Sequence, residues 1–156
     1  MPFRVLMVCT GNTCRSPLAE GILRALVPTD APSITVASAG TAGFDGAPAT
    51  RLARDVARSH GVDISAHRSS ALMRRALEEA DLVLAMTREH EDDVLSLAPD
   101  ARKQTFLLSE FASGEREDVP DPVGGTLEDY EAVYAMLDGY LRKALPRIVA
   151  MAEGKA

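Results

Sequence analysis

The chain has 156 residues, of which 46% are hydrophobic and 26% charged, and it carries a formal net charge of −6 at pH 7. This composition is ordinary for a globular protein, and the length predicts one domain spanning residues 1–156. The acidic balance argues against a nucleic-acid partner. No apolar run reaches the roughly 18 residues of a membrane span, and the first residues show no signal-peptide pattern, so we expect no membrane partner.

The first predicted element is a short buried strand at residues 5–8, which enters a loop that ends at Pro17. Pro17 suits the first turn of a helix because its missing N–H would be unpaired there, and Leu18 and Ile22 follow at helical spacing. A strand, tight loop and helix start of this kind directs several backbone N–H groups at one spot, with the positive end of the helix dipole behind them. The sequence therefore predicts a bowl for a doubly charged oxyanion at residues 9–17.

Two side chains of this loop supply chemistry. We expect Cys9 at the bottom of the bowl, where the positive field favours the ionised, nucleophilic thiolate. Arg15 is expected to close the bowl, since a guanidinium can hold two phosphate oxygens in a planar fork. The pair predicts a thiolate nucleophile beside a bound phosphoryl group.

The remaining chain alternates apolar runs with helical patterns. Strands are predicted at residues 33–38, 81–86 and 105–108, and helices at 49–60, 71–79, 88–97 and from 127 onward. Ser70 is expected to cap the second of these helices and Thr126 the last. Residues 109–125 are predicted to be a long loop without regular structure, and such loops are often functional. The alternation predicts a single-domain α/β fold with a doubly wound, four-stranded parallel sheet and helices on both faces. Sheets of this kind bind ligands at the carboxyl ends of their strands.

Residues 9–17 read Cys-Thr-Gly-Asn-Thr-Cys-Arg-Ser-Pro. This string, placed after an apolar strand at the N-terminus, resembles the phosphate loop of the low-molecular-weight protein phosphatase family. The resemblance covers nearly the whole chain. It implies the strand order 2-1-3-4, phosphorylated protein substrates, a cysteinyl-phosphate intermediate and no cofactor.

Further expectations concern metal, assembly and location. The three histidines show no metal-ligand spacing with each other or with the cysteines, so we expect no metal. Two cysteines, one of them a thiolate, suit a reducing compartment, which favours a cytoplasmic location. We expect the chain to act as a monomer.

The family resemblance implies roles for other residues. Asp121 resembles the general acid, which protonates the leaving atom and then deprotonates a water, and Pro122 biases it toward an extended conformation. Asp118 is the weaker candidate for that acid and could instead bind a cationic substrate. Ser38 and His67 resemble residues that support the loop, with His67 reaching the loop asparagine.

Within the loop itself, Ser16 is expected by the resemblance to donate a hydrogen bond to the Cys9 thiolate. Asn12 is expected in a left-handed conformation, which asparagine tolerates better than most residues. The substrate-binding residues are then predicted to be Thr10, Gly11, Asn12, Thr13, Cys14, Ser16 and Asp118.

Two positions favour one substrate class over another. Tyrosine-specific members have an apolar branched residue where Thr13 stands, and aromatic residues where Val123 and Gly124 follow the Asp-Pro pair. Thr13 together with the Asp-Pro-x-Gly-Gly segment resembles the bacterial protein-arginine phosphatases of the same family. We therefore predict phosphoarginine as the substrate, with phosphotyrosine as the alternative.

Two remote alternatives stay open. A thioredoxin-coupled arsenate reductase uses the same loop but needs further cysteines, and this chain has only Cys9 and Cys14. A non-catalytic phosphate-binding module would be expected to lack Cys9, Arg15 or Asp121, and all three are present.

Overall fold

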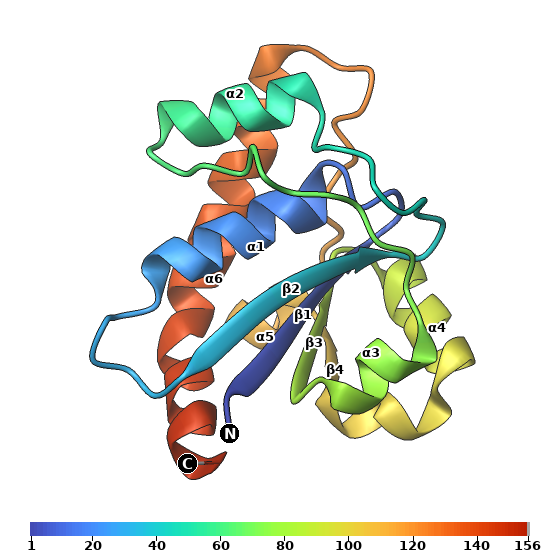
Figure 1. Ribbon diagram of the computed structural model, residues 1–156, viewed down its shortest axis with the longest axis vertical. Helices are drawn as coiled ribbons and strands as arrows, with labels where there is room; N and C mark the ends of the chain where they lie inside the picture. Colours follow the sequence, from blue (N-terminus) through green and yellow to red (C-terminus); the bar gives the residue numbers. More distant parts are fainter. Residues whose placement is uncertain (156) are drawn as a thin grey trace.

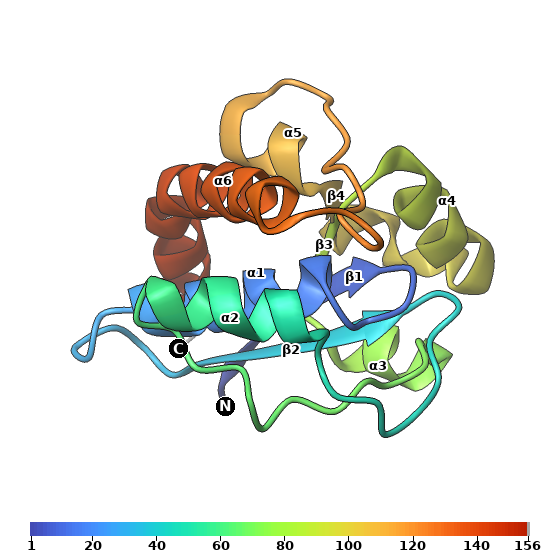
Figure 2. The same cartoon turned by 90° about the horizontal axis from the view of Figure 1, so that it is seen from above.

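A four-stranded parallel sheet organises the computed structural model, which describes residues 1–155. The strands lie in the order β2-β1-β3-β4, as the family resemblance implied. Their bounds are β1 Phe3–Cys9, β2 Ile34–Gly40, β3 Leu82–Ala85 and β4 Thr105–Leu107. The central strands β1 and β3 are almost wholly buried, as parallel strands covered on both faces must be. Figure 2 shows the strands side by side in this order.

Helices cover both faces of the sheet, as predicted (Figure 1). They are α1 Arg15–Leu26, α2 Arg51–Ser59, α3 Arg74–Glu79, α4 Arg88–Leu97, the 3-10 helix η1 Pro99–Gln104, α5 Leu108–Ser113 and α6 Leu127–Lys155. Helices α1, α5 and α6 lie on one side, with α2 packed outside them, and α3 and α4 lie on the other side. No helix within residues 1–155 combines the length and apolar character needed to cross a membrane.

Strand β1 divides its side chains between two cores, because successive residues of a strand point to opposite faces. Val5 and Met7 belong to the larger core with α1 and α6, whereas Leu6 and Val8 face α3 and α4. The strand is therefore held on both sides up to Cys9, its last residue, which is itself buried. This double packing fixes the point from which the loop at 10–14 departs.

The prediction of a structureless loop at 109–125 is wrong in its first part. Residues 108–113 form α5, which ends at Gly114 in the left-handed conformation with φ of 81°. Phe111 is buried there and lies beneath the guanidinium of Arg147, whose central carbon is 4.1 Å from the ring centroid. The helix forms because Leu108 and Phe111, three residues apart, share one buried face.

The predicted cap at Ser70 is also wrong. Helix α3 begins at Arg74, with Met73 at its N-cap and no side-chain cap. The backbone of Ser70 instead donates from its N–H to Asn12 Oδ1 at 2.8 Å and accepts from Gly40 N at 2.9 Å. These tertiary bonds hold residue 70 in an extended path beside the loop.

The predicted cap at Thr126 is confirmed. Its N–H donates to Asp129 Oδ2 at 2.9 Å, and its hydroxyl oxygen accepts from Asp129 N at 3.3 Å. This reciprocal pair satisfies two donors at the start of α6. The cap fixes the start of α6, and so the end of the loop that follows α5 and contains Asp121.

Candidate active site

The loop between β1 and α1 is braced by the end of β2. Thr41 N donates to Cys9 O at 2.8 Å, and Ala42 N donates to Thr10 O at 2.9 Å. Gly40 lies so close to the loop that an added Cβ would collide with Thr10 O and lie 3.0 Å from Asn12 N. A glycine is therefore required at this point so that β2 can support the loop backbone.

Asn12 makes the turn. Its φ is 57°, the left-handed conformation that the sequence predicted, and its side chain is fully buried. Its Nδ2 donates to Ser16 Oγ at 2.8 Å and to Ser38 Oγ at 2.9 Å, while Oδ1 accepts from Ser70 N. Because a backbone N–H can only donate, the bond from Ser70 fixes which end of the amide is the oxygen.

These bonds set the direction of the hydroxyl of Ser16. Its oxygen already accepts from Asn12, and it lies 2.9 Å from the sulfur of Cys9. The serine proton is thus free to point at the sulfur as a hydrogen-bond donor. Cys9 and Ser16 are both buried, so the interaction is shielded from water.

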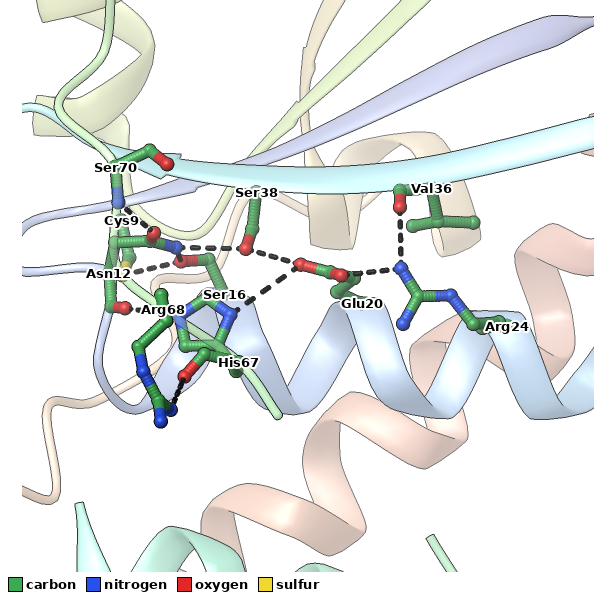
Figure 3. A network of polar contacts seen from close by, with 10 residues as sticks. All are labelled: Cys9, Asn12, Ser16, Glu20, Arg24, Val36, Ser38, His67, Arg68 and Ser70. Atoms are coloured by element: carbon green, nitrogen blue, oxygen red, sulfur yellow. Dashed lines mark hydrogen bonds and ion pairs between the residues drawn. The ribbon is translucent and has the colours of Figure 1, made fainter. Parts of the chain in front are cut away.

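Glu20 lies at the far end of the same network (Figure 3). Ser38 Oγ donates to Glu20 Oε1 at 2.5 Å, and Arg24 donates to Oε2 at 2.5 Å. An ionised carboxylate only accepts, so Ser38 must donate to it and must accept from Asn12. Glu20 thereby fixes the direction of the Ser38 hydroxyl, and the bond from Ser70 fixes the Asn12 amide between Ser38 and Ser16.

His67 holds the same turn from the outside. Its Nε2 donates to the carbonyl oxygen of Asn12 at 2.8 Å, and its Nδ1 lies 4.0 Å from Glu20 Oε1. The contact between His67 and the loop asparagine is the one that the family resemblance implied. The ring therefore lies between the backbone of Asn12 and the carboxylate that accepts from Ser38.

Arg15 and Asp121 meet on the solvent side of the loop. Arg15 is the first residue of α1 and is 5% exposed, and one of its terminal nitrogens donates to Val119 O at 3.0 Å. The other lies 3.4 Å from Thr10 Oγ1 and 3.6 Å from Asp121 Oδ2. Val119 N donates to Met86 O at 2.9 Å, which attaches this segment to the end of β3.

Asp118 is directed elsewhere. Its Oδ1 accepts from Arg88 N at 2.9 Å and lies 3.3 Å from the Arg88 guanidinium. These contacts, led by the backbone hydrogen bond, hold the pKa of Asp118 below its ordinary value. Of the two carboxylates in the segment, Asp121 is the one that faces Arg15.

The remaining loop side chains are placed around the rim and in the core. Cys14 is buried, with its sulfur 3.4 Å from the hydroxyl oxygens of both Thr50 and Tyr130. Burial raises the pKa of Tyr130 to about 12, so this hydroxyl stays protonated at neutral pH. Thr13 is half-buried, and its carbonyl accepts from Thr50 N at 2.9 Å. Cys14 can therefore meet a ligand only through its backbone.

The sequence was compared with known proteins. Residues 4–153 match the family model described as low molecular weight phosphotyrosine protein phosphatase. The chain belongs to this family.

Relatives within the family fall into two groups. A protein-arginine-phosphatase of Geobacillus stearothermophilus is 42% identical over 85% of this chain and 86% of its own. The low molecular weight protein-tyrosine-phosphatase Etp of Escherichia coli K12 is 39% identical over 86% of each chain. The structure of YwlE arginine phosphatase from Geobacillus stearothermophilus has a TM-score of 0.90 and 35% identity, covering 99% of this chain and 98% of its own.

One solved structure bears on the chemistry. It is a mutant of YwlE arginine phosphatase with a phosphorylated active site serine, and it has a TM-score of 0.89 and 33% identity over 94% of this chain and 95% of its own. In that low molecular weight phosphatase a phosphoryl group is attached to the protein at the active site.

Sequence reasoning about this phosphatase missed Glu20. A signal existed, because Glu20 lies one helical turn after Ser16 and so shares its face of α1. Its partner Ser38 comes from β2, however, and only the fold brings the two together. No group of three or more potential metal ligands is found within the described residues 1–155.

Exchanging the carboxylate of Glu20 for an amide tests the orienting network. Glu20→Gln adds an amide N–H donor where only acceptors stood, so the Ser38 hydroxyl is no longer forced to donate to residue 20. We expect kcat/KM on an aryl phosphate to fall roughly 3- to 10-fold, the equivalent of one hydrogen bond.

The matched control is Glu128→Gln on the exposed first turn of α6, which should leave kcat/KM unchanged. A Glu20→Gln enzyme within twofold of wild type would show that the carboxylate does not orient the loop.

Proposed function

We propose that this member of the family is a cysteine-dependent protein phosphatase that hydrolyses phosphoarginine in proteins. The observation that carries the proposal is the arrangement around one loop, with Cys9 Sγ 2.9 Å from Ser16 Oγ and Arg15 3.6 Å from Asp121. These groups supply a nucleophile, an oxyanion clamp and an acid at one place.

In the first step the Cys9 thiolate attacks phosphorus in line with the bond to the leaving nitrogen. The sulfur–phosphorus bond forms as the phosphorus–nitrogen bond breaks, and protonated Asp121 gives its proton to the leaving group. The loop N–H groups and Arg15 hold the equatorial oxygens, which is the positioning and charge stabilisation that phosphoryl transfer requires. Ser16 stabilises the thiolate before the attack.

In the second step Asp121, now a carboxylate, takes a proton from a water. The oxygen of this water attacks the cysteinyl-phosphate, the sulfur–phosphorus bond breaks, and inorganic phosphate leaves with the thiolate restored. The Asp121 side chain suits this alternation because it is half exposed and its Oδ1 is oriented by Val123 N at 3.1 Å. The phosphorylated serine in the YwlE mutant supports a covalent intermediate of this kind.

The choice of phosphoarginine rests on residues at the mouth of the loop. A phosphoarginine side chain is a planar group rich in N–H donors, and unpaired donors would cost about 1–3 kcal/mol on burial. The hydroxyl of Thr13 and the carboxylate of Asp121 offer acceptors. Val123, which is 58% exposed, and Gly124 offer no aromatic face for a phenyl ring. Phosphotyrosine remains the second candidate, since relatives of both kinds have comparable identity.

Other parts of the proposal follow from the chemistry. Cys9 must stay reduced to act, which fits the cytosol. We further propose that the protein acts as a monomer on phosphorylated protein partners, without nucleic acid, in keeping with its net charge of −6. An arsenate reductase is disfavoured because Cys14, the only other cysteine, is buried among Thr50 and Tyr130.

Replacing the nucleophile tests the core of the proposal. Cys9→Ser should lose at least roughly a thousandfold in kcat, because a hydroxyl is not ionised at neutral pH. Binding of inorganic phosphate, measured by calorimetry, should persist because the loop N–H groups and Arg15 remain. Turnover within tenfold of wild type would remove Cys9 from its role.

Asp118 and Asp121, the two carboxylates compared above, give a second test. Asp121→Asn should slow a substrate with a poor leaving group about 10²- to 10⁴-fold. It should slow an activated aryl phosphate much less, since that leaving group needs little protonation. The matched control is Asp118→Asn, which should show no such dependence on the leaving group. The reverse pattern would identify Asp118 as the acid.

Thr13→Ile tests the substrate class. The substitution removes the hydroxyl acceptor of Thr13 and adds a larger apolar surface. Activity should therefore fall on phosphoarginine and rise on phosphotyrosine. For a change of about 1–2 kcal/mol, the ratio of the two kcat/KM values should move roughly 5- to 30-fold.

Both kcat/KM values are measured with peptides of matched sequence in wild type and in Thr13→Ile. An unchanged ratio, or a wild type that already prefers phosphotyrosine, would make the protein a tyrosine phosphatase and leave the roles of Cys9 and Asp121 intact.

A further inference from the structure

His90 is a buried side chain in contact with the phosphate loop. It lies in the first turn of α4, is 3% exposed, and its Nε2 is 2.7 Å from Thr10 Oγ1. Its other ring nitrogen, Nδ1, is buried without a hydrogen-bond partner among the described residues. Nothing in the spacing of the sequence links a residue of α4 to Thr10, which is 80 positions away.

The contacts of Thr10 define how the ring is protonated. Thr10 Oγ1 also lies 3.4 Å from a terminal nitrogen of Arg15, which can only donate. A neutral imidazole has one N–H, and a buried N–H without a partner is rarer than a buried unpaired acceptor. The N–H therefore belongs on Nε2, where it donates to Thr10, and Nδ1 keeps its lone pair.

The surroundings keep the ring neutral. Burial, and then the nearby Arg15 guanidinium, lower the pKa of His90 to about 4, although Asp118 and Asp121 act in the opposite direction. Arg88, on the same helix, is paired with Asp118 and leaves that carboxylate less able to stabilise an imidazolium. His90 thus adds no positive charge beside Arg15 at neutral pH.

We propose that His90 is a positioning residue of the phosphate loop, which donates to Thr10 Oγ1 and holds this hydroxyl oxygen as an acceptor for Arg15. The guanidinium is then held from two sides, by Thr10 at 3.4 Å and by Val119 O at 3.0 Å. It is aimed before a phosphoryl group arrives, so its orientation does not have to be set during the reaction. The inference rests on the phosphatase function proposed above.

The test compares two replacements of His90. His90→Gln keeps an N–H donor near the position of Nε2, whereas His90→Met has similar length and no donor. Each is assayed for kcat and KM on para-nitrophenyl phosphate and for inhibition by orthovanadate, an oxyanion whose binding requires an aimed Arg15. We expect His90→Met to weaken vanadate inhibition and kcat/KM roughly 3- to 15-fold, with His90→Gln within about threefold of wild type.

Two controls separate positioning from stability. Val94→Ala removes a buried side chain of the same helix, and should lower the melting temperature without changing vanadate inhibition. In a double-mutant cycle, His90→Met combined with Thr10→Val should lower kcat/KM no more than the more damaging single change. Both changes break the same contact, between His90 Nε2 and Thr10 Oγ1. Additive losses, or equal losses in His90→Gln and His90→Met, would overturn the proposal.

The protonation of the ring is measured independently of turnover. Nitrogen-15 NMR of histidine-labelled wild type at pH 7 should show His90 as the neutral tautomer protonated on Nε2. Protonation on Nδ1, or an imidazolium, would overturn the assignment. Because vanadate binding and the tautomer need no catalysis, a wild type without phosphatase activity would refute the proposed function and still leave the role of His90 decided.

Discussion

The hydrogen bonds of Asn12 are the constraint on which the site depends. This residue turns the chain through a left-handed conformation at the one place where β1 must become α1. Its buried amide then uses three hydrogen bonds, to Ser16, Ser38 and Ser70, and its carbonyl a fourth, to His67. A buried amide left partly unpaired would cost free energy, so the segments that supply these partners are coupled to the shape of the loop.

Through this coupling, hydrogen bonds connect the sulfur of Cys9 to residues as far away as Glu20. The hydrogen bonds diverge from the Asn12 amide, which donates to Ser38 on the side of Glu20 and to Ser16 on the side of Cys9. On the other side of the loop, Arg15 is held by the carbonyl of Val119 and by the hydroxyl of Thr10. Cys9 and Arg15 are thus positioned by two separate sets of contacts. Such preorganisation is the main means by which proteins stabilise phosphoryl transfer.

The sequence contained most of the fold and the centre of the site, because both depend on local patterns. The apolar run before Cys9, the proline at the helix start and the alternation of strands and helices predicted the sheet and the place of the loop. Short-range signals failed where tertiary contacts decide. Helix α5 spans only 108–113, where the sequence predicts a strand end at 108 and then a loop. Ser70 has the residue type of a helix cap, although its N–H donates to Asn12. Sequence patterns alone do not identify Glu20 or His90 as site residues, because their partners, Ser38 on β2 and Thr10 in the loop, are distant in the sequence.

Val119 has a consequence for how a substrate reaches the site. It bonds to Met86 through its N–H and to Arg15 through its carbonyl, and Asp121 follows only two residues later. Two residues of chain extend at most about 7 Å, so the backbone of Asp121 stays within that distance of Val119. In the proposed mechanism, Asp121 therefore stays close to Arg15, and a phosphorylated side chain meets both groups at the same place.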